Sequence, residues 1–223
     1  MTLRRLSLRT AVFCALTLSA AAVNAQSAPL PADLDAKSLA RLPYVQRKDA
    51  DESAKRLFDI FVRGGSSATD ALSGPLAFAA YNVPVANALL DLHDGAVGKG
   101  TLDAHVRELA ILVACRATNY DFEWNAHETA ALRAGVPQQI IDIVRTNGAL
   151  AGVPEADAAV IRFGRELLDD RKMSSATFAK AKQLFGDKGA MDLVAVMSTY
   201  AVSGFYAIAV DEHLPAGQPT LPR

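Results

Sequence analysis

The chain has 223 residues, a length that suits one domain with a substantial hydrophobic core. Its 23 basic and 24 acidic residues nearly balance and give a formal net charge of −1 at pH 7. Because there is no basic cluster beyond the first ten residues, the composition gives little support for electrostatic binding of nucleic acid, and we expect no nucleic-acid partner.

The first 25 residues have the pattern of a cleavable export signal. "MTLRRLSLRT" carries three arginines and no acid, and "AVFCALTLSAAAV" is an apolar run that is shorter than the roughly 20 residues of a membrane-spanning helix. Val23 and Ala25 then supply the small residues of a cleavage site. We predict a signal peptide over residues 1–25, cleavage after Ala25 and export, to the periplasm. No later apolar run looks long enough to span a membrane, so we expect no membrane association after cleavage.

The two cysteines limit the redox chemistry of the chain. Cys14 lies in the predicted signal, which leaves Cys115 as the single thiol of the exported chain. An intrachain disulfide and an intrachain dithiol couple are therefore both excluded after cleavage.

The N-terminal third alternates turns with short helical segments. Residues 26–50 are rich in proline, alanine and charge, which predicts an extended arm with at most one short helix. Apolar residues at helical spacing predict a helix over 49–65, ended by Gly64-Gly65; these residues are Ala54, Leu57, Phe58 and Phe61. Glycine and proline punctuate the residues that follow, up to 100, into short Ala/Leu-rich helices.

Two central helices follow. Thr101 or Asp103 can cap the first, whose run from Leu109 to Ala114 is apolar all round and therefore predicts a buried helix. The second is expected from Tyr120 to Ala134, with Asn119 as its cap and Gly135 as its left-handed end.

The C-terminal part also reads as helical. Pro137 and Pro154 each open a helix at its first turn, and Ser174 or Ser175 caps the next. The last helix, 187–210, is mostly apolar and is expected to pack in the core or against another subunit, and residues 215–223 are expected to be coil. Because strand-like alternation is missing, we predict an all-α fold.

The stretch "DFEWNAHETAALRAGV" has the highest density of chemical groups. On a helix, Tyr120, Glu123 and His127 lie on one stripe, so that a carboxylate and an imidazole are one turn apart. Glu108 on the preceding helix is flanked by apolar turns, and burying it without a partner would be costly. His127 is the natural partner for Glu108. From spacing alone, His127 can equally be a satisfied, partly buried structural histidine.

The segment "RELAILVACRATNYDFEWNAHETAALRAGV" resembles the signature of the carboxymuconolactone decarboxylase family, which includes AhpD-like alkylhydroperoxidases. The resemblance covers roughly residues 70–150. The AhpD-like branch has a glutamate, then Cys-x-x-Cys, then a histidine; alignment on His127 places the glutamate at Glu108 and the cysteines at Tyr120 and Glu123. Both cysteines are absent here, whereas "FEWNAH" is similar to the decarboxylase-like branch.

The resemblance implies an AhpD-like helical bundle over residues 51–214 that assembles as a homo-oligomer, a trimer or hexamer. It also implies a cofactor-independent lyase that acts on a small carboxylated lactone or related organic acid, with no metal. His127, Glu108 and Glu123 would be the catalytic acid-base groups. Candidate substrate contacts are Tyr120, Trp124, Arg107, Arg116 and Arg133.

Several alternatives stay open at this point. Trp124 can be a core residue, Glu123 a first-turn acid and Glu108 the partner of an arginine. "HETAA" begins like a zinc-protease motif, but Ala131 stands where that motif has its second histidine. An AhpD-like peroxidase and a non-catalytic protein that binds a small acid are the competing functions. Export is unusual for an enzyme of aromatic degradation, so the resemblance does not supply the substrate.

Overall fold

The computed structural model describes residues 30–50, 52–63 and 74–223. The predicted signal peptide and the predicted helix end at Gly64-Gly65 lie outside these residues. Residues 32–223 form one compact unit.

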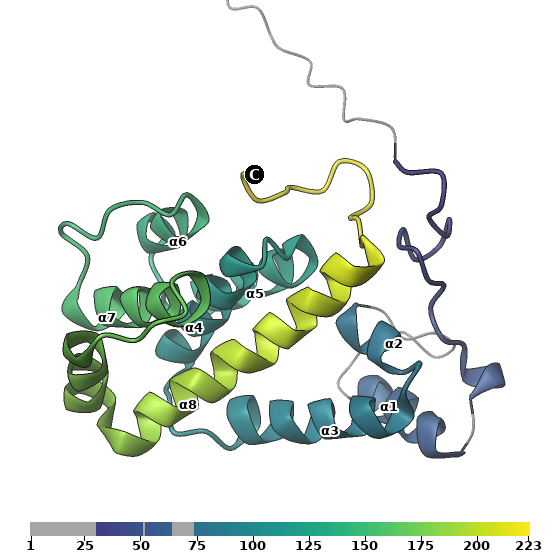
Figure 1. The fold of residues 1–223 in the computed structure, drawn as a ribbon, viewed down its shortest axis with the longest axis horizontal. Helices are drawn as coiled ribbons and strands as arrows, with labels where there is room; N and C mark the ends of the chain where they lie inside the picture. The colour runs from purple at the N-terminus through teal and green to yellow at the C-terminus, as the bar shows by residue number, and fades with distance from the viewer. Residues whose placement is uncertain (1–29, 51, 64–73) are drawn as a thin grey trace, which may run out of the picture. The chain divides into compact units, whose positions relative to one another are not determined.

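The described residues form helices and no β-strand, which confirms the all-α prediction (Figure 1). The α-helices are α1 Glu52–Arg63, α2 Pro75–Ala79, α3 Val83–His93, α4 Ala104–Ala117, α5 Asp121–Arg133, α6 Gln138–Arg145, α7 Glu155–Gly164 and α8 Ser175–Val210. A 3-10 turn at Arg47–Asp49 and π turns at Asp94–Gly98 and Arg165–Asp169 complete the set. Of the predicted helix over 49–65, residues 52–63 are described as helical, with Ala54, Leu57 and Phe58 buried.

Helix α4 is the centre of the core. All residues from Leu109 to Cys115 are buried, as their unbroken apolar run predicts, and α4 contacts α5, α6, α7 and α8. Asp103 caps α4 by accepting a hydrogen bond from the backbone N–H of Val106 at 2.9 Å. Helix α7 approaches closely because Gly164 has no side chain: a Cβ there would lie 2.3 Å from a Val113 methyl carbon.

Helix α8 crosses α4 and consists of two helical pieces joined at Gly186 (Figure 1). Gly186 has φ of 72°, so the backbone breaks where the sequence separates the two predicted helices, and Ser174 caps the first piece. By length and composition alone, α8 could cross a membrane, so the expectation that no later run is long enough is wrong. Half of its most apolar stretch is buried inside the protein, as in the core helix of a globular domain, and the absence of a membrane partner stays a prediction.

The segment 26–50 was predicted to be an arm, but its described part packs against the end of α8. The backbone N–H of Arg41 donates to the carbonyl of Val210 at 2.7 Å, and that of His213 donates to the carbonyl of Leu39 at 2.9 Å. Ala40 is fully buried at this junction. The chain therefore uses this segment to hold the start of its C-terminal tail in place.

The start of α5 differs from the prediction. Tyr120, not Asn119, precedes the first helical residue, and no side chain caps the helix. Asn119 has a left-handed φ of 49°, and its side-chain oxygen accepts from Arg116, so it is turned away from the free N–H groups of α5. Gly135 has φ of 87° and ends the helix as predicted.

Candidate active site

Glu108 and His127 come together from adjacent helices. Glu108 lies on the buried face of α4, and His127 is on the second turn of α5, which packs against α4. His127 Nδ1 is 2.8 Å from Glu108 Oε2, and both side chains are largely buried. The contact expected from the cost of burying Glu108 alone is present in the structure.

The other nitrogen of His127 faces a second carboxylate. His127 Nε2 is 3.3 Å from Glu123 Oε2, one helical turn earlier on α5. Burial opposes protonation of the imidazole, but the hydrogen bonds and the negative charges of Glu108 and Glu123 outweigh it and raise the pKa of His127 to about 9. At neutral pH this side chain is an imidazolium held between two acids.

Tyr200 on α8 covers this cluster. Its ring meets the His127 ring edge to face, with centroids 4.9 Å apart, and only 4% of the residue is exposed. Burial raises the pKa of Tyr200, and the charges of Glu123 and Glu108 raise it further. Tyr200 was not predicted because it lies in the mostly apolar run 187–210, where the polar stretch "STY" was the available signal.

His93 at the end of α3 also belongs to these surroundings. Its ring centroid is 6.2 Å from that of Tyr200, and its pKa is lowered by burial and by the charge of His127, against the opposing influence of Glu123. The residue is exposed, and the packing of α3 on α8 brings its ring near Tyr200 at the edge of the cluster.

Of the three candidate arginines, Arg107 lies nearest the cluster. Its Nε is 3.8 Å from Glu108 Oε1, and this buried N–H has no hydrogen-bond partner among the residues that the structure describes. Arg116 instead donates to the carbonyl of Arg145 at 2.7 Å, and Arg133 is exposed at the end of α5. Arg107 is therefore the candidate with an unused donor beside Glu108.

Tyr120 does not contact His127 but a third acid. Its hydroxyl donates to Glu212 Oε2 at 3.1 Å, and the Tyr44 hydroxyl donates to Glu212 Oε1 at 3.4 Å. Burial is the main cause that raises the pKa of Glu212, and the charge of Glu123 acts in the same direction. The two tyrosine hydrogen bonds oppose this rise, and the resulting pKa is about 7. Sequence reasoning missed Glu212, because its partners Tyr44 and Tyr120 lie far from it in the sequence.

Trp124 was predicted as a substrate contact and lies instead in the core. Only 1% of it is exposed, and its indole N–H donates to Glu128 Oε2 at 3.0 Å. The guanidinium of Arg145 stacks over its ring at 5.0 Å. These contacts satisfy the indole inside the protein, so the structure supports a packing role.

Cys115 is completely buried on α4. Burial raises the pKa of its thiol well above the ordinary value, and the charges of Glu123 and Glu108 act in the same direction. The thiol is therefore held in its protonated, unreactive form.

A cavity of about 330 Å³ lies between the start of α5, the end of α8 and the C-terminal tail. Tyr120 and Glu212 line it, whereas Glu108, Glu123 and His127 do not. Two neighbouring sites thus share the beginning of α5: the His127 cluster, formed by Glu108, Glu123 and His127, and the cavity beside Glu212.

Comparison with known proteins agrees with this description. The chain is similar to a crystal structure described as an alkylhydroperoxidase AhpD core, an uncharacterized peroxidase-related protein from Ralstonia eutropha JMP134. The TM-score is 0.62 at 20% sequence identity, over 79% of this chain and 93% of that one, which shows the AhpD-like helical fold. No curated protein matches significantly.

Residues 84–163 match the model of the carboxymuconolactone decarboxylase family, which confirms the resemblance predicted from the sequence. The matched part begins in α3, ends in α7 and includes all three members of the His127 cluster. The family contains decarboxylases as well as AhpD-like peroxidases.

Proposed function

We propose that the chain is an exported, cofactor-independent carboxy-lyase that acts on a small carboxylated lactone or a related organic acid. The observation that carries this proposal is the His127 imidazolium held between Glu108 and Glu123. Such a group supplies a proton in a largely buried setting, and its two carboxylates fix the orientation of the ring.

The proposed reaction needs one proton and a site for negative charge. The bond between the ring carbon and the departing carboxylate breaks, CO₂ leaves, and the electron pair moves onto the lactone carbonyl as a dienolate. His127 then donates the proton of Nε2 to carbon. For this step the longer of its two contacts, the one between Nε2 and Glu123, must open. The free N–H of Arg107 is the candidate partner for the substrate carboxylate or the developing oxyanion.

A screen of small lactones and keto-acids for CO₂ release tests this proposal. We expect His127→Ala to lower turnover of the active substrate by about 100-fold or more, the range typical of a lost general acid. His105→Ala is the matched control, because His105 also contacts a buried carboxylate, Asp157 at 2.8 Å, but belongs to a different part of the bundle. Full activity of His127→Ala would contradict the assignment.

A peroxidase of the AhpD-like type is the second candidate, favoured by the structural likeness described above. It needs thiol chemistry, whereas Cys115 is buried and its pKa is raised. Peroxide consumption with a dithiol reductant that disappears in Cys115→Ser would support this candidate. Peroxide consumption that survives the substitution, or is absent from the start, would remove it.

A non-catalytic protein that binds a small acid is the third candidate. Two results together would favour it: the protein binds a small carboxylate, and the substitutions His127→Ala and Glu108→Gln leave all turnover unchanged.

We also propose that the protein is a homo-oligomer, a trimer or hexamer. Met191 and Phe205 support this, because both are exposed apolar residues on α8. Light scattering is expected to give several times the mass of one chain, and a clean monomer would contradict the proposal.

A further inference from the structure

The cavity beside Glu212 has a composition that suits a ligand of its own. It has a volume of about 330 Å³, at the small end of the range of ligand pockets. Three apolar side chains form part of its wall: Phe122, Ile208 and Leu214. The remaining lining is mainly polar, with three acids, Asp121, Asp211 and Glu212, against two basic residues, His213 and Arg223.

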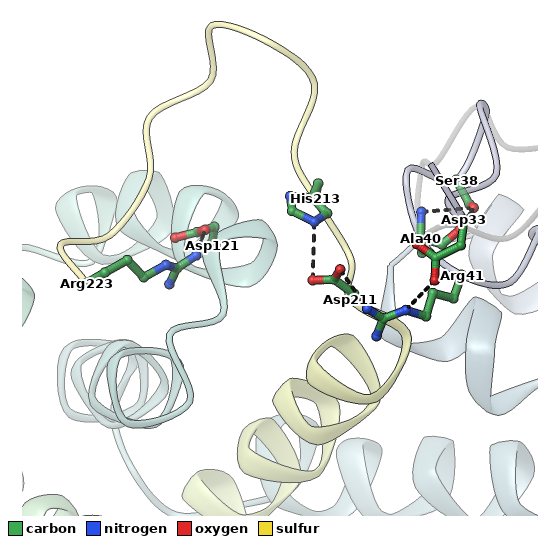
Figure 2. A network of polar contacts seen from close by, with 8 residues as sticks. All are labelled: Asp33, Ser38, Ala40, Arg41, Asp121, Asp211, His213 and Arg223. Carbon is green, nitrogen blue, oxygen red and sulfur yellow. Dashed lines mark hydrogen bonds and ion pairs between the residues drawn. The ribbon is translucent and has the colours of Figure 1, made fainter. Parts of the chain in front are cut away.

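Two of these three acids have cationic partners. Asp121 pairs with Arg223 at 2.5 Å, and Asp211 pairs with Arg41 at 3.1 Å, as Figure 2 shows. His213 lies 3.2 Å from the same Asp211 carboxylate. The segment 30–50 and the C-terminal tail thus supply counter-charges for both aspartates.

Among the residues that the structure describes, Glu212 has no such partner. Its two oxygens accept only from the hydroxyls of Tyr44 and Tyr120, and within the described part of the chain no lysine, arginine or histidine pairs with it. Hydroxyl donors satisfy hydrogen bonding but leave the charge of the carboxylate uncompensated. A cation in the cavity would supply what the protein itself does not.

We propose that this cavity binds a small organic amine, whose ammonium group pairs with the carboxylate of Glu212. The apolar body of the amine lies against Phe122, Ile208 and Leu214. The site is distinct from the His127 cluster, and this proposal does not rest on the proposed lyase activity.

The surroundings of Glu212 predict how binding depends on pH. Tyr44 from the N-terminal segment, Tyr120 before α5 and Glu123 on α5 all act on the carboxyl, and its pKa is about 7. Asp211 and His213 flank it in the tail, where they pair with each other. An ammonium needs the ionised form, so affinity is expected to rise about tenfold from pH 6 to pH 8, where an ordinary amine stays protonated.

A titration of the full exported chain with benzylamine, followed by ¹H–¹⁵N NMR, tests the proposal. We expect a Kd of about 1 mM, the scale for so small a ligand, with shifts centred on the amides of Phe122 and Leu214. Benzyl alcohol and benzoate have the same body without the cation and are expected to bind at least about tenfold more weakly.

Glu212→Gln keeps the shape and hydrogen bonding of the side chain but removes its charge, and it is expected to weaken benzylamine binding about tenfold. Glu155→Gln is the matched control, since Glu155 is an acid on the surface that pairs with Lys180. If Glu212→Gln does not fold, the pH dependence of the unaltered chain still tests the proposal. Equal affinity of Glu212→Gln and the unaltered chain, stronger binding of benzoate, affinity that does not change between pH 6 and pH 8, or no shifts with benzylamine would each overturn it.

Discussion

The His127 cluster and the surroundings of Glu212 both remove carboxylates from water, but they do so with different partners. Glu108 and Glu123 share an imidazolium, whereas Glu212 has two tyrosine hydroxyls. The pKa of the His127 imidazolium is about 9, whereas that of the Glu212 carboxyl is about 7. Each group accepts or makes two polar contacts, so the number of contacts does not explain the difference. The opposite charges in the His127 cluster compensate one another and keep it charged at neutral pH, whereas the uncompensated Glu212 carboxyl titrates near neutrality.

The largest expected difference between the two sites is the loss of unfolding free energy at alkaline pH that His127 causes. The pKa of His127 is raised from 6.5 to about 9, so its stabilising contribution is complete below about 6.5 and is lost as the pH rises through about 9. The loss amounts to about 3 kcal/mol. Urea unfolding of the unaltered chain and of His127→Gln between pH 6 and pH 10 measures it as the difference between the two curves. Parallel curves would show that the imidazole titrates alike in the folded and unfolded states.

Glu212→Gln is expected to act in a lower pH window. The pKa of Glu212 is raised from 4.5 to about 7, so the unaltered chain loses stability as the pH rises from about 4.5 through 7, and the glutamine variant does not. At pH 8 the variant is expected to be more stable by about 2 kcal/mol, which allows for partial exposure of the side chain. Thermal unfolding at pH 5 and pH 8 checks this, and a variant less stable at pH 8 would contradict it.

The tyrosine donors provide a finer test of the same site. Tyr120→Phe removes the shorter hydrogen bond to Glu212 and is expected to raise the carboxyl pKa further and to cost about 1 kcal/mol above pH 8. Tyr44→Phe, which removes the longer contact, is the matched comparison and is expected to have the smaller effect. A ¹³C NMR titration of the Glu212 carboxyl measures both shifts. A pKa that falls in Tyr120→Phe would contradict the assigned role.

The smallest effect is expected at the exposed ion pair that closes the tail. Arg223→Ala removes the contact with Asp121, but Arg223 is exposed, and the backbone N–H of Leu221 still donates to Asp121 at 2.7 Å. Its cost in unfolding free energy is expected to be below about 1 kcal/mol. Chemical denaturation measures it, and a loss of several kcal/mol would mean that the tail holds the bundle together.

The fold was predictable wherever local pattern decided it. The apolar run from Leu109 to Ala114, the caps Asp103 and Ser174, and the left-handed Gly135 all have the structural roles that their sequence context indicates. Asn119 failed as a cap because its backbone is left-handed and its side chain accepts from Arg116, three residues earlier, so that Tyr120 takes the position before the helix.

The site was predictable only in part, for the same reason. Glu108 and His127 meet because α4 and α5 are consecutive helices, so their spacing carries the information. Tyr200 and Glu212 reach the region from the other end of the chain, and nothing in the local sequence marks their partners. Trp124 was assigned to the site because it lies next to Glu123 in the sequence, but its side chain is buried in the core.

The protonation state of His127 is the most direct test of the account. An ¹⁵N NMR titration of the imidazole is expected to show both ring nitrogens protonated at pH 7.5 and a transition near pH 9. Glu108→Gln is expected to lower that transition, because it removes one of the two charges that hold the proton. A neutral imidazole at pH 7.5, with a transition near the ordinary value of about 6.5, would contradict it.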